Sequence, residues 1–344
     1  MVTILGIKRL LEAQRNGFFS NISRRILVLG CPQPEALKIL KLSDVLICHP
    51  EKSVVQKAQE LNFQTLVDLE RFNKIRISRS VRTAIVWVTK SRSETLFNIA
   101  LAFLITPKAG KIILTGEKKD GIEYAIKKLS AMIEPMSVIS KSHGKIGLFQ
   151  RPRHLPKALR SWKKKGELQK NASGFFSSPG TFSETNIDKG SQLLVSHYSG
   201  KLHGNVIDLG AGWGYLSAEA IKNSPSIRLL TLIDCNLSAL NSARLNVASS
   251  KARFFWLDLK TDTLALKNLD HVIMNPPFHI GRKVNFDLGL TFLGTAQKIL
   301  RKGGILWMVF NRELPYEKSI ASLFPNYDLL NETKNYKVIR AKKT

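Results

Sequence analysis

Short apolar runs alternate with longer helical segments along this chain, and the alternation is clearest in the first half. Runs typical of buried strands cover residues 25–30, 44–48, 82–88 and 110–116. Segments with the spacing of a helix cover residues 7–14, 34–40 and 93–106. Buried strands separated by helices are typical of an α/β domain with a mostly parallel sheet, so the pattern predicts such a domain here.

The same order of elements recurs in the second half. Its strands 206–210 and 302–308 match 26–30 and 108–114 of the first half, at an offset of about 180–195 residues that is too long for a solenoid repeat. Further strands are predicted at 229–234, 252–257 and 270–274, and helices at 215–222 and 237–247. We therefore interpret the chain as an internal duplication with two α/β domains in tandem.

The two copies differ where their strands end. The second copy has Gly-x-Gly-x-Gly at 210–214, and the first has Gly-Cys-Pro at 30–32. The second has Asn-Pro-Pro-Phe at 275–278, and we match it to Thr-Lys-Ser-Arg at 89–92 of the first. The first copy is therefore expected to keep the scaffold and to lack the site.

The stretch Asn275-Pro276-Pro277-Phe278 follows the apolar run 270–274. Proline has a fixed φ and no N–H, so the strand ends here and the backbone leaves it stiffly. The Asn275 amide and the carbonyls of Asn275 and Pro276 are then acceptors at the carboxyl end of a strand. They suit a planar amino group on a ring, which Phe278 could stack against. The tetrapeptide could also form an ordinary tight turn.

A glycine-rich turn begins at Asp208 and contains Gly210, Gly212 and Gly214. It follows a predicted strand and opens a predicted helix, which is the context in which such a turn lets a ligand approach the backbone. Asp208 could instead simply hold the loop through its backbone N–H groups. A lone turn of this kind is generic, so its meaning depends on the strand ends that come after it.

Two more carboxylates end the next strands. Asp234 lies 20 residues after Gly214, where an acidic group can accept both hydroxyls of a ribose. Asp258 ends the third strand, within reach of an adenine ring. Asp234 could instead cap the helix 237–247, and Asp258 could be a turn residue.

These features and Asn275 follow one another at the ends of four successive strands, the edge where open α/β sheets bind ligands. A nicotinamide cofactor would leave Asn-Pro-Pro-Phe without a function, and the phosphate-binding G-x-x-x-x-G-K-[S/T] motif is absent. S-adenosylmethionine fits every feature, so we predict it as the cofactor.

The composition of the chain indicates which kinds of binding partner to expect. The 344-residue chain is long enough for two domains, and its formal net charge of +27 favours a polyanion or an anionic membrane surface. No apolar run approaches the roughly 18–20 residues that span a bilayer. The three scattered cysteines fit buried thiols in a reducing compartment and lack metal-ligand spacing. We expect a cytoplasmic protein without a metal.

Basic residues gather between the two halves. The segment 151–175 combines prolines with a run of lysines, and we expect a basic linker there. With aromatic residues nearby, such a segment favours contact with nucleic acid over a merely solvated surface. The candidates for RNA contact are Arg151, Arg153, Lys163, Lys164 and Lys165.

The second half resembles the class I S-adenosylmethionine-dependent methyltransferases. More narrowly, it resembles the guanine-N2 ribosomal RNA methyltransferase family typified by ribosomal RNA small subunit methyltransferase C. The matching stretches are 179–183 (PGTFS), 188–194 (DKGSQLL), 208–214 (DLGAGWG), 275–281 (NPPFHIG) and 314–316 (LPY), together with Asp234. The first half also matches, including 116–122 (GEKKDGI), so the resemblance covers nearly the whole chain.

The resemblance implies two tandem Rossmann-like domains, each a mostly parallel sheet with helices on both faces. A degenerate domain at 1–150 would position RNA, a linker would span 151–175, and the catalytic domain would span 176–344. The implied reaction transfers a methyl group from S-adenosylmethionine to the exocyclic N2 of a guanosine in ribosomal RNA, with 16S rRNA of the small subunit as the first choice. Phe182 and Gln192 should lie near the cofactor.

Other functions remain open from the sequence. The substrate could be 23S rRNA, because a sister enzyme shares these motifs. Asn-Pro-Pro-aromatic also serves enzymes that methylate adenine N6 in DNA or a glutamine amide in protein. An RNA-binding ribosome-assembly factor without catalysis is the alternative from a different class. His279 could take the proton that the amine loses, or it could shape the pocket.

Overall fold

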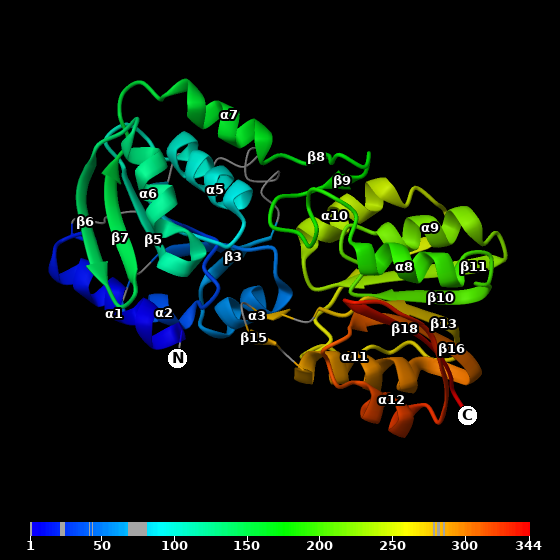
Figure 1. Ribbon diagram of the computed structural model, residues 1–344. Coiled ribbons are helices and arrows are strands. Elements are labelled where there is room, and N and C mark those ends of the chain that lie inside the picture. The colour runs from blue at the N-terminus through cyan, green and yellow to red at the C-terminus, as the bar shows by residue number, and fades with distance from the viewer. Residues whose placement is uncertain are drawn as a thin grey trace. The chain divides into compact units, whose positions relative to one another are not determined.

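The computed structural model describes residues 2–20, 25–40, 42, 44–67, 81–277, 279–280, 283–284 and 286–344. The chain divides into two compact units, Met1–Glu167 and Leu168–Thr344, and each is described by itself (Figure 1). The segment 151–175, expected as a linker, is divided between them. Its helix α7 (Lys157–Lys165) lies in the first unit and packs against α5 (Arg92–Ile105).

The first unit is a seven-stranded sheet with helices on both faces. Its other helices are α1 (Val2–Arg15), α2 (Glu35–Lys38), α3 (Lys52–Glu60) and α6 (Ile122–Ser130). Its strands are β1 (Arg25–Leu29), β2 (Val45–Cys48), β3 (Gln64–Leu66), β4 (Val81–Trp87), β5 (Lys111–Glu117), β6 (Pro135–Lys141) and β7 (Gly144–Gln150). The strand order is β3-β2-β1-β4-β5-β7-β6, and β7 is antiparallel to both of its neighbours.

The second unit repeats this architecture. Its helices are α8 (Lys189–Tyr198), α9 (Tyr215–Asn223), α10 (Leu237–Asn246), α11 (Phe286–Ile299) and α12 (Glu317–Leu323). Its strands are β10 (Gly204–Leu209), β11 (Ile227–Asp234), β12 (Ala252–Trp256), β13 (Leu269–Met274), β16 (Leu300–Asn311), β17 (Asn326–Glu332) and β18 (Tyr336–Lys342). The order is β12-β11-β10-β13-β16-β18-β17, with β18 antiparallel to both neighbours. Two short pairs, β8 (Gln169–Lys170) with β9 (Phe176–Ser177) and β14 (His279–Ile280) with β15 (Lys283–Val284), complete it.

The strand orders of the two units correspond position by position, which confirms the duplication and the two tandem α/β domains. The strands 135–141, 144–150, 326–332 and 336–342 were not predicted, because each mixes apolar residues with polar or charged ones. The predicted helix 34–40 is shorter than expected and covers Glu35–Lys38.

Each sheet is buried on both faces, because successive side chains of a strand point to opposite sides. In β1, Leu27 and Leu29 join one hydrophobic cluster, whereas Ile26 and Val28 join another. Burying a large apolar side chain contributes about 1.5–3 kcal/mol, so these central strands fix the scaffold. The same alternation occurs in β10, with one polar exception at Asp208.

Strand register corrects one correspondence between the copies. Leu29 of β1 pairs with Val86 of β4, and Leu209 of β10 pairs with Met274 of β13. Val86 and Met274 are therefore equivalent, so the next residue of β4, Trp87, occupies the position of Asn275.

The match of Asn275 to Thr89 was wrong by two residues. In the second unit the prolines end the strand directly after Met274, whereas the apolar run of the first continues through Val88. The end of an apolar run is therefore not an equivalent landmark in the two copies, and only the pairing of neighbouring strands aligns them.

Candidate active site

The glycine-rich turn leaves β10 in a backbone conformation that favours glycine. Gly210, Gly212 and Gly214 have φ values of 73°, 56° and 87°, in the left-handed region. A Cβ on Gly214 would lie 3.0 Å from the Cβ of Ala243, so this glycine allows close packing between the start of α9 and α10. A Cβ on Gly212 would meet nothing within 4 Å, so the backbone at this point faces open space.

Asp234 ends β11 beside this turn. Its Oδ2 accepts the Gly212 N–H at 2.8 Å, and its Oδ1 accepts the Asn236 N–H at 2.8 Å. The N-cap of α10 is Asn236, whose side chain accepts the N–H of Ala239, so the alternative function of Asp234 as the helix cap is wrong. The carboxylate expected to face a ribose is thus held directly against the glycine turn.

Asp208 is fully buried below the turn. Its Oδ2 accepts a hydrogen bond from the Ser217 hydroxyl at 2.7 Å, whereas its Oδ1 has no partner among the described residues. Burial raises the pKa of Asp208 to about 7; the bond from Ser217 opposes this shift and the nearby charge of Asp234 adds to it. In the alternative interpretation, Asp208 holds the glycine turn through backbone N–H groups of the turn. Its hydrogen-bond partner Ser217 lies instead on α9, after the turn, so Asp208 ties β10 to this helix.

Asn275 directly follows β13 and lies at the same edge of the sheet. Its Nδ2 donates to Asp188 Oδ2 at 3.0 Å and to Ser191 Oγ at 2.9 Å. Both partners belong to the start of α8, so the amide oxygen Oδ1 is the end of the side chain left to accept from a substrate. Pro276 is buried and Pro277 is exposed. The contact was not predicted from the sequence, and neither was helix α8, whose N-cap is Asp188.

Two residues expected near Asn275 lie wholly or partly outside the described residues. Phe278 lies outside them altogether. The backbone of His279 forms the short pair β14–β15 opposite Val284, but its side chain belongs to the part of the chain that the structure does not describe. Base stacking by Phe278 and a function of His279 therefore stay predictions.

Phe182 lies in a segment that is tied to the glycine turn. Its backbone carbonyl accepts the indole N–H of Trp213 at 2.9 Å, while 62% of the residue is exposed. Asn246 donates to the carbonyls of Phe176 and Trp213, both at 2.7 Å, which anchors the same segment from α10. The backbone of an exposed aromatic residue is thus tied to the side chain of Trp213 in the glycine turn. Trp213 and Asn246, which build this anchor, were not singled out from the sequence.

The positions of Asp258 and Gln192 do not by themselves indicate a binding function. Asp258 is buried, and its Oδ1 accepts the Lys260 N–H at 2.9 Å, so it closes a turn after β12 as the alternative interpretation allowed. Gln192 is exposed on α8. Contacts of either residue with a cofactor stay predictions.

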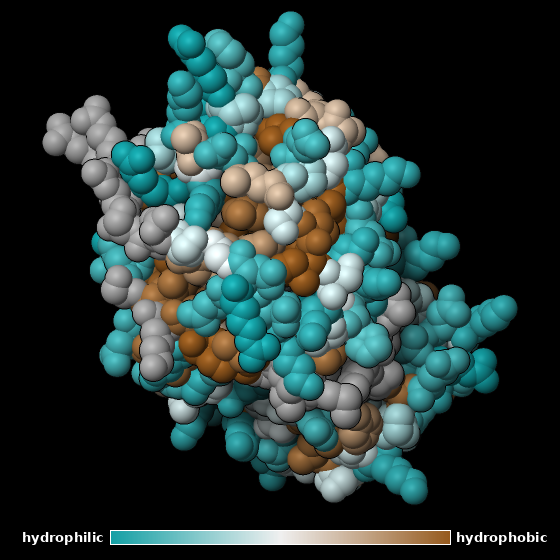
Figure 2. Space-filling model, turned by 90° about the vertical axis from the view of Figure 1, so that its left-hand side faces the viewer, coloured by the Kyte–Doolittle hydropathy of each residue, from teal (hydrophilic) through white to brown (hydrophobic). Residues whose placement is uncertain are grey.

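The five basic residues proposed for RNA contact differ in their exposure and in their partners within the protein. Arg151 donates to the carbonyls of Phe103 and Pro152, and Lys163 pairs with Glu167, so both charges are partly engaged. The other three candidates are exposed: Arg153, Lys164 and Lys165. Leu159 and Trp162 of α7 are buried against α5 in the core of the first unit, which turns Lys157, Arg160 and Lys164 toward solvent. Figure 2 shows one face of the molecule on which long hydrophilic side chains project around apolar ones.

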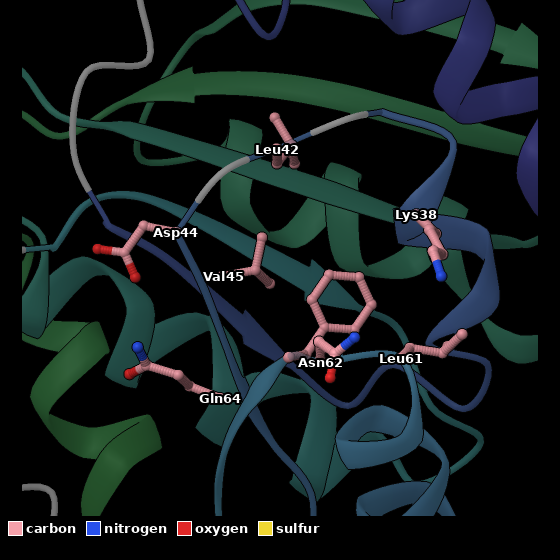
Figure 3. A pocket seen from close by; sticks show the side chains of 8 residues that line it. Lys38, Leu42, Asp44, Val45, Leu61, Asn62 and Gln64 are labelled. Carbon is pink, nitrogen blue, oxygen red and sulfur yellow. The ribbon is translucent and has the colours of Figure 1, made fainter.

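A cavity lies away from this edge of the second unit. A cavity of about 370 Å³ in the first unit is lined by Lys38, Asp44, Asn62 and Gln64 together with apolar side chains (Figure 3). Asp44 precedes β2 and Gln64 begins β3, so the cavity lies at the amino ends of these strands. Open α/β sheets bind ligands at the opposite, carboxyl edge, and we assign this hollow no function.

Two absences hold for the described part of the chain. There, no helix has both the length and the apolar character to cross a membrane. The described residues also contain no group of three or more His, Cys, Asp or Glu side chains that could hold a metal ion.

The sheet order, the glycine turn and Asn275 at one carboxyl edge define the second unit as a class I methyltransferase domain. Residues 172–340 match the family described as Methyltransferase small domain, and residues 14–151 match its N-terminal counterpart. The chain is 31% identical over 265 residues to the ribosomal RNA small subunit methyltransferase C of Shewanella pealeana, covering 74% of this chain and 76% of that protein. It is 30% identical over 262 residues to the same enzyme of Shewanella sediminis, covering 74% and 75%. The chain therefore belongs to the ribosomal RNA small subunit methyltransferase C family.

A solved structure extends the likeness to the whole fold. The T. thermophilus 16S rRNA N2 methyltransferase, in complex with AdoMet and guanosine, superposes with a TM-score of 0.80 at 20% identity. The match covers 100% of this chain and 92% of that one. Both units, including the one without a glycine-rich turn, therefore follow the fold of that enzyme.

Proposed function

We propose that this chain transfers the methyl group of S-adenosylmethionine to the exocyclic N2 amine of a guanosine in 16S ribosomal RNA. Membership in the family supports the cofactor and the reaction, and the names of its relatives support the small-subunit substrate. Ribosomal RNA as substrate also favours a cytoplasmic location.

The observation that carries the proposal is the orientation of Asn275. Because its Nδ2 is bound by Asp188 and Ser191, its Oδ1 is directed away from α8 and can accept an N–H from the substrate. The Pro276 carbonyl is the candidate for the second acceptor. Two acceptors fix an amino group and favour the nitrogen as it gains positive charge. No strong base is required, because the alkylated amine is acidic.

The residues beside the turn fit the cofactor. Gly212 faces open space, and Asp234 stands at the strand end where ribose hydroxyls are accepted in such sheets. Phe182, Asp208, Gly210 and Gly214 complete the proposed binding edge, with Asp258 toward the adenine. When bound, S-adenosylmethionine supplies an activated sulfonium methyl group, so the protein mainly provides orientation. The acceptors at Asn275 hold the amine in line, and Phe278 would stack on a guanine that is unpaired or flipped out.

The first unit is proposed to position the RNA. With the segment 151–175, it presents exposed basic side chains on and beside α7, among them Arg153 and Lys164. Arg151, Lys163 and Lys165 are proposed to add to the same surface. Contacts with phosphates supply affinity without reading sequence, so they complement a site that recognises one base.

A methyl-transfer assay tests the reaction and separates the alternatives. The purified chain is supplied with tritiated S-adenosylmethionine and with unmodified 16S rRNA, 30S subunits, 23S rRNA, DNA or a peptide mixture. Label at guanine N2 of 16S rRNA or of 30S subunits supports the proposal. Label found only in 23S rRNA, in adenine of DNA or in glutamine of a peptide would show that the substrate is that molecule and not 16S rRNA. If no substrate is labelled but the chain still binds RNA, a non-catalytic assembly factor is favoured.

Asn275→Ala tests the residue that carries the proposal. Losing the acceptor should lower kcat by about 100-fold or more, in the range seen when one aligned hydrogen-bonding group of an active site is removed. Affinity for S-adenosylhomocysteine, measured by calorimetry, should stay within a few fold. Loss of turnover and of cofactor affinity together would contradict the assigned role.

A further inference from the structure

Asp188 connects the start of α8 with Asn275. Its Oδ2 accepts the Ser191 N–H at 2.7 Å as the N-cap of α8, and the same oxygen accepts Nδ2 of Asn275 at 3.0 Å. The hydroxyl of Ser191 accepts the Asn275 amide as well, at 2.9 Å. The two residues that hold the amide are thus 84 and 87 positions away from it in the chain.

Tyr336 of β18 lies beside the start of α8. Burial raises the pKa of Tyr336, and the negative charge of Asp188 raises it further. Gly190 allows the approach, because a Cβ there would lie 2.8 Å from the Tyr336 ring. The Asp188 carboxylate is therefore held both by the start of α8 and by the Asn275 amide.

The first unit offers an internal comparison. Helix α1 precedes β1 as α8 precedes β10, and its residues Val2 to Gly6 include no Asp or Glu. The position of Asn275 is taken there by Trp87, and the helix presents Gly6, whose added Cβ would lie 3.2 Å from the indole. Where the second unit has an amide held by Asp188 and Ser191, the first unit has an indole packed against Gly6.

We propose that Asp188 is a positioning residue that determines which end of the Asn275 amide faces the substrate. A carboxylate only accepts hydrogen bonds, so it selects the rotamer in which Nδ2 points at Asp188 and Oδ1 points outward. The opposite rotamer would present an N–H to an amino group that also donates, which leaves both groups without an acceptor. This inference rests on the proposed function and assigns it one more residue.

An exchange of the two groups is the sharpest test. Asn275→Asp alone places two carboxylates within about 3 Å, where like charges disfavour ionisation of both; turnover should fall at least as far as in Asn275→Ala. Adding Asp188→Asn restores a donor–acceptor pair, because the new amide donates to the new carboxylate and leaves its other oxygen for the substrate. The double variant should have a kcat about 10-fold or more above that of Asn275→Asp, by recovering part of the roughly 100-fold that orientation can supply.

A second variant separates positioning from helix capping. Serine is as good an N-cap as aspartate, but its shorter side chain should not reach the amide. Asp188→Ser should lower kcat by about 10–100-fold, with KM for RNA and affinity for S-adenosylhomocysteine little changed. Asp188→Asn, which keeps an oxygen for both contacts, is the matched control and should retain most of the activity.

The outcomes separate the two proposals. If the parent chain binds cofactor but transfers no methyl group to any RNA, the proposed function fails. If the parent chain is active, Asp188 is not a positioning residue when Asp188→Ser leaves kcat unchanged. The same conclusion holds when a folded, cofactor-binding double variant is no more active than Asn275→Asp.

Discussion

The two units of this chain share one strand order and differ in what stands at the carboxyl ends of the strands. Beside β1 and β2 the first unit has Pro32 and His49, where the second has Gly212 and Asp234. After β4 it has Trp87, where β13 is followed by Asn275. Gly212, Asp234 and Asn275 are thus each replaced by a residue of different chemistry, whereas Gly210 has the equivalent glycine Gly30.

The residues at the carboxyl edge of the first unit's sheet are also less polar than those of the second unit. Trp87 is only 7% exposed and packs against α1, and burial lowers the pKa of His49 to about 4, so that its imidazole is neutral. Val28 stands fully buried where the second unit has Asp208. The comparison teaches that the scaffold does not require polar groups at this edge. The second unit has polar groups there, including the buried carboxylate of Asp208, which destabilises the unit when it is charged. We attribute the presence of these groups to ligand binding.

The largest effect is expected when the second turn is made to resemble the first. Proline cannot adopt the φ of 56° at Gly212 and has no N–H for Asp234, which costs about 3 kcal/mol or more. Gly212→Pro should therefore weaken S-adenosylhomocysteine binding by about 100-fold or more, measured by calorimetry on a variant whose fold is checked by circular dichroism.

Two variants control this result. Gly212→Ala keeps the N–H and its Cβ meets no protein atom, so its cost in folding stability should be only the strain of a positive φ, about 1 kcal/mol. Pro32→Gly in the first unit should create no cofactor binding, because His49 and Trp87 remain. Undiminished affinity in Gly212→Pro would show that the turn does not approach the cofactor.

The strands and the ligand-binding edge were predictable from local patterns. Val206 to Leu209 and Leu269 to Met274 are mostly apolar runs, and glycine or proline soon follows each of them, so a few adjacent residues are enough to predict where these strands end. Their carboxyl ends meet at one edge in any parallel sheet, so the approach of Asp234 to Gly212 follows from topology.

The contacts that hold Asn275 in place could not be predicted from local sequence patterns. Asp188 and Asn275 are 87 residues apart, and no spacing rule joins a helix cap to a distant amide. The equivalence of Trp87 with Asn275 required strand register, because a shift of two residues leaves the alternation of faces unchanged. The antiparallel strands carry charges such as those of Lys337 and Arg340 within β18, so a search for apolar runs did not find them.

A smaller effect is expected from removing the buried charge that the first unit lacks. Because the folded pKa of Asp208 is about 7, above its ordinary value of 3.8, folding is favoured by protonation and opposed once the group ionises. Asp208→Asn should therefore be more stable than the parent above pH 7, and the difference should shrink as pH falls and vanish near pH 4. About 1.4 kcal/mol per pKa unit predicts a Tm rise of several degrees, measured without cofactor by calorimetric scans.

Asp270→Asn supplies a control of opposite sign. Burial acts to raise the pKa of Asp270, but hydrogen bonds from Asn205 and Arg301 lower it overall. Its charge therefore contributes stability at neutral pH that is lost as pH falls below 3.8, and its removal should destabilise at pH 7. An Asp208→Asn variant that is less stable than the parent at pH 8 would contradict the assigned ionisation.

The smallest effect tests what the first unit does in place of binding a cofactor. Arg160→Gln with Lys164→Gln removes two exposed charges from α7 and leaves its buried Leu159 and Trp162 in place. If both charges meet phosphates, the slope of log affinity against log salt should fall by about 1.4–1.8, with a several-fold loss of affinity for rRNA and unchanged affinity for S-adenosylhomocysteine. The matched control, Lys127→Gln with Lys128→Gln, removes two exposed charges from α6 of the same unit. Equal losses in the two pairs would mean that net charge alone attracts the RNA, whereas a loss confined to α7 would assign the helix a defined contact.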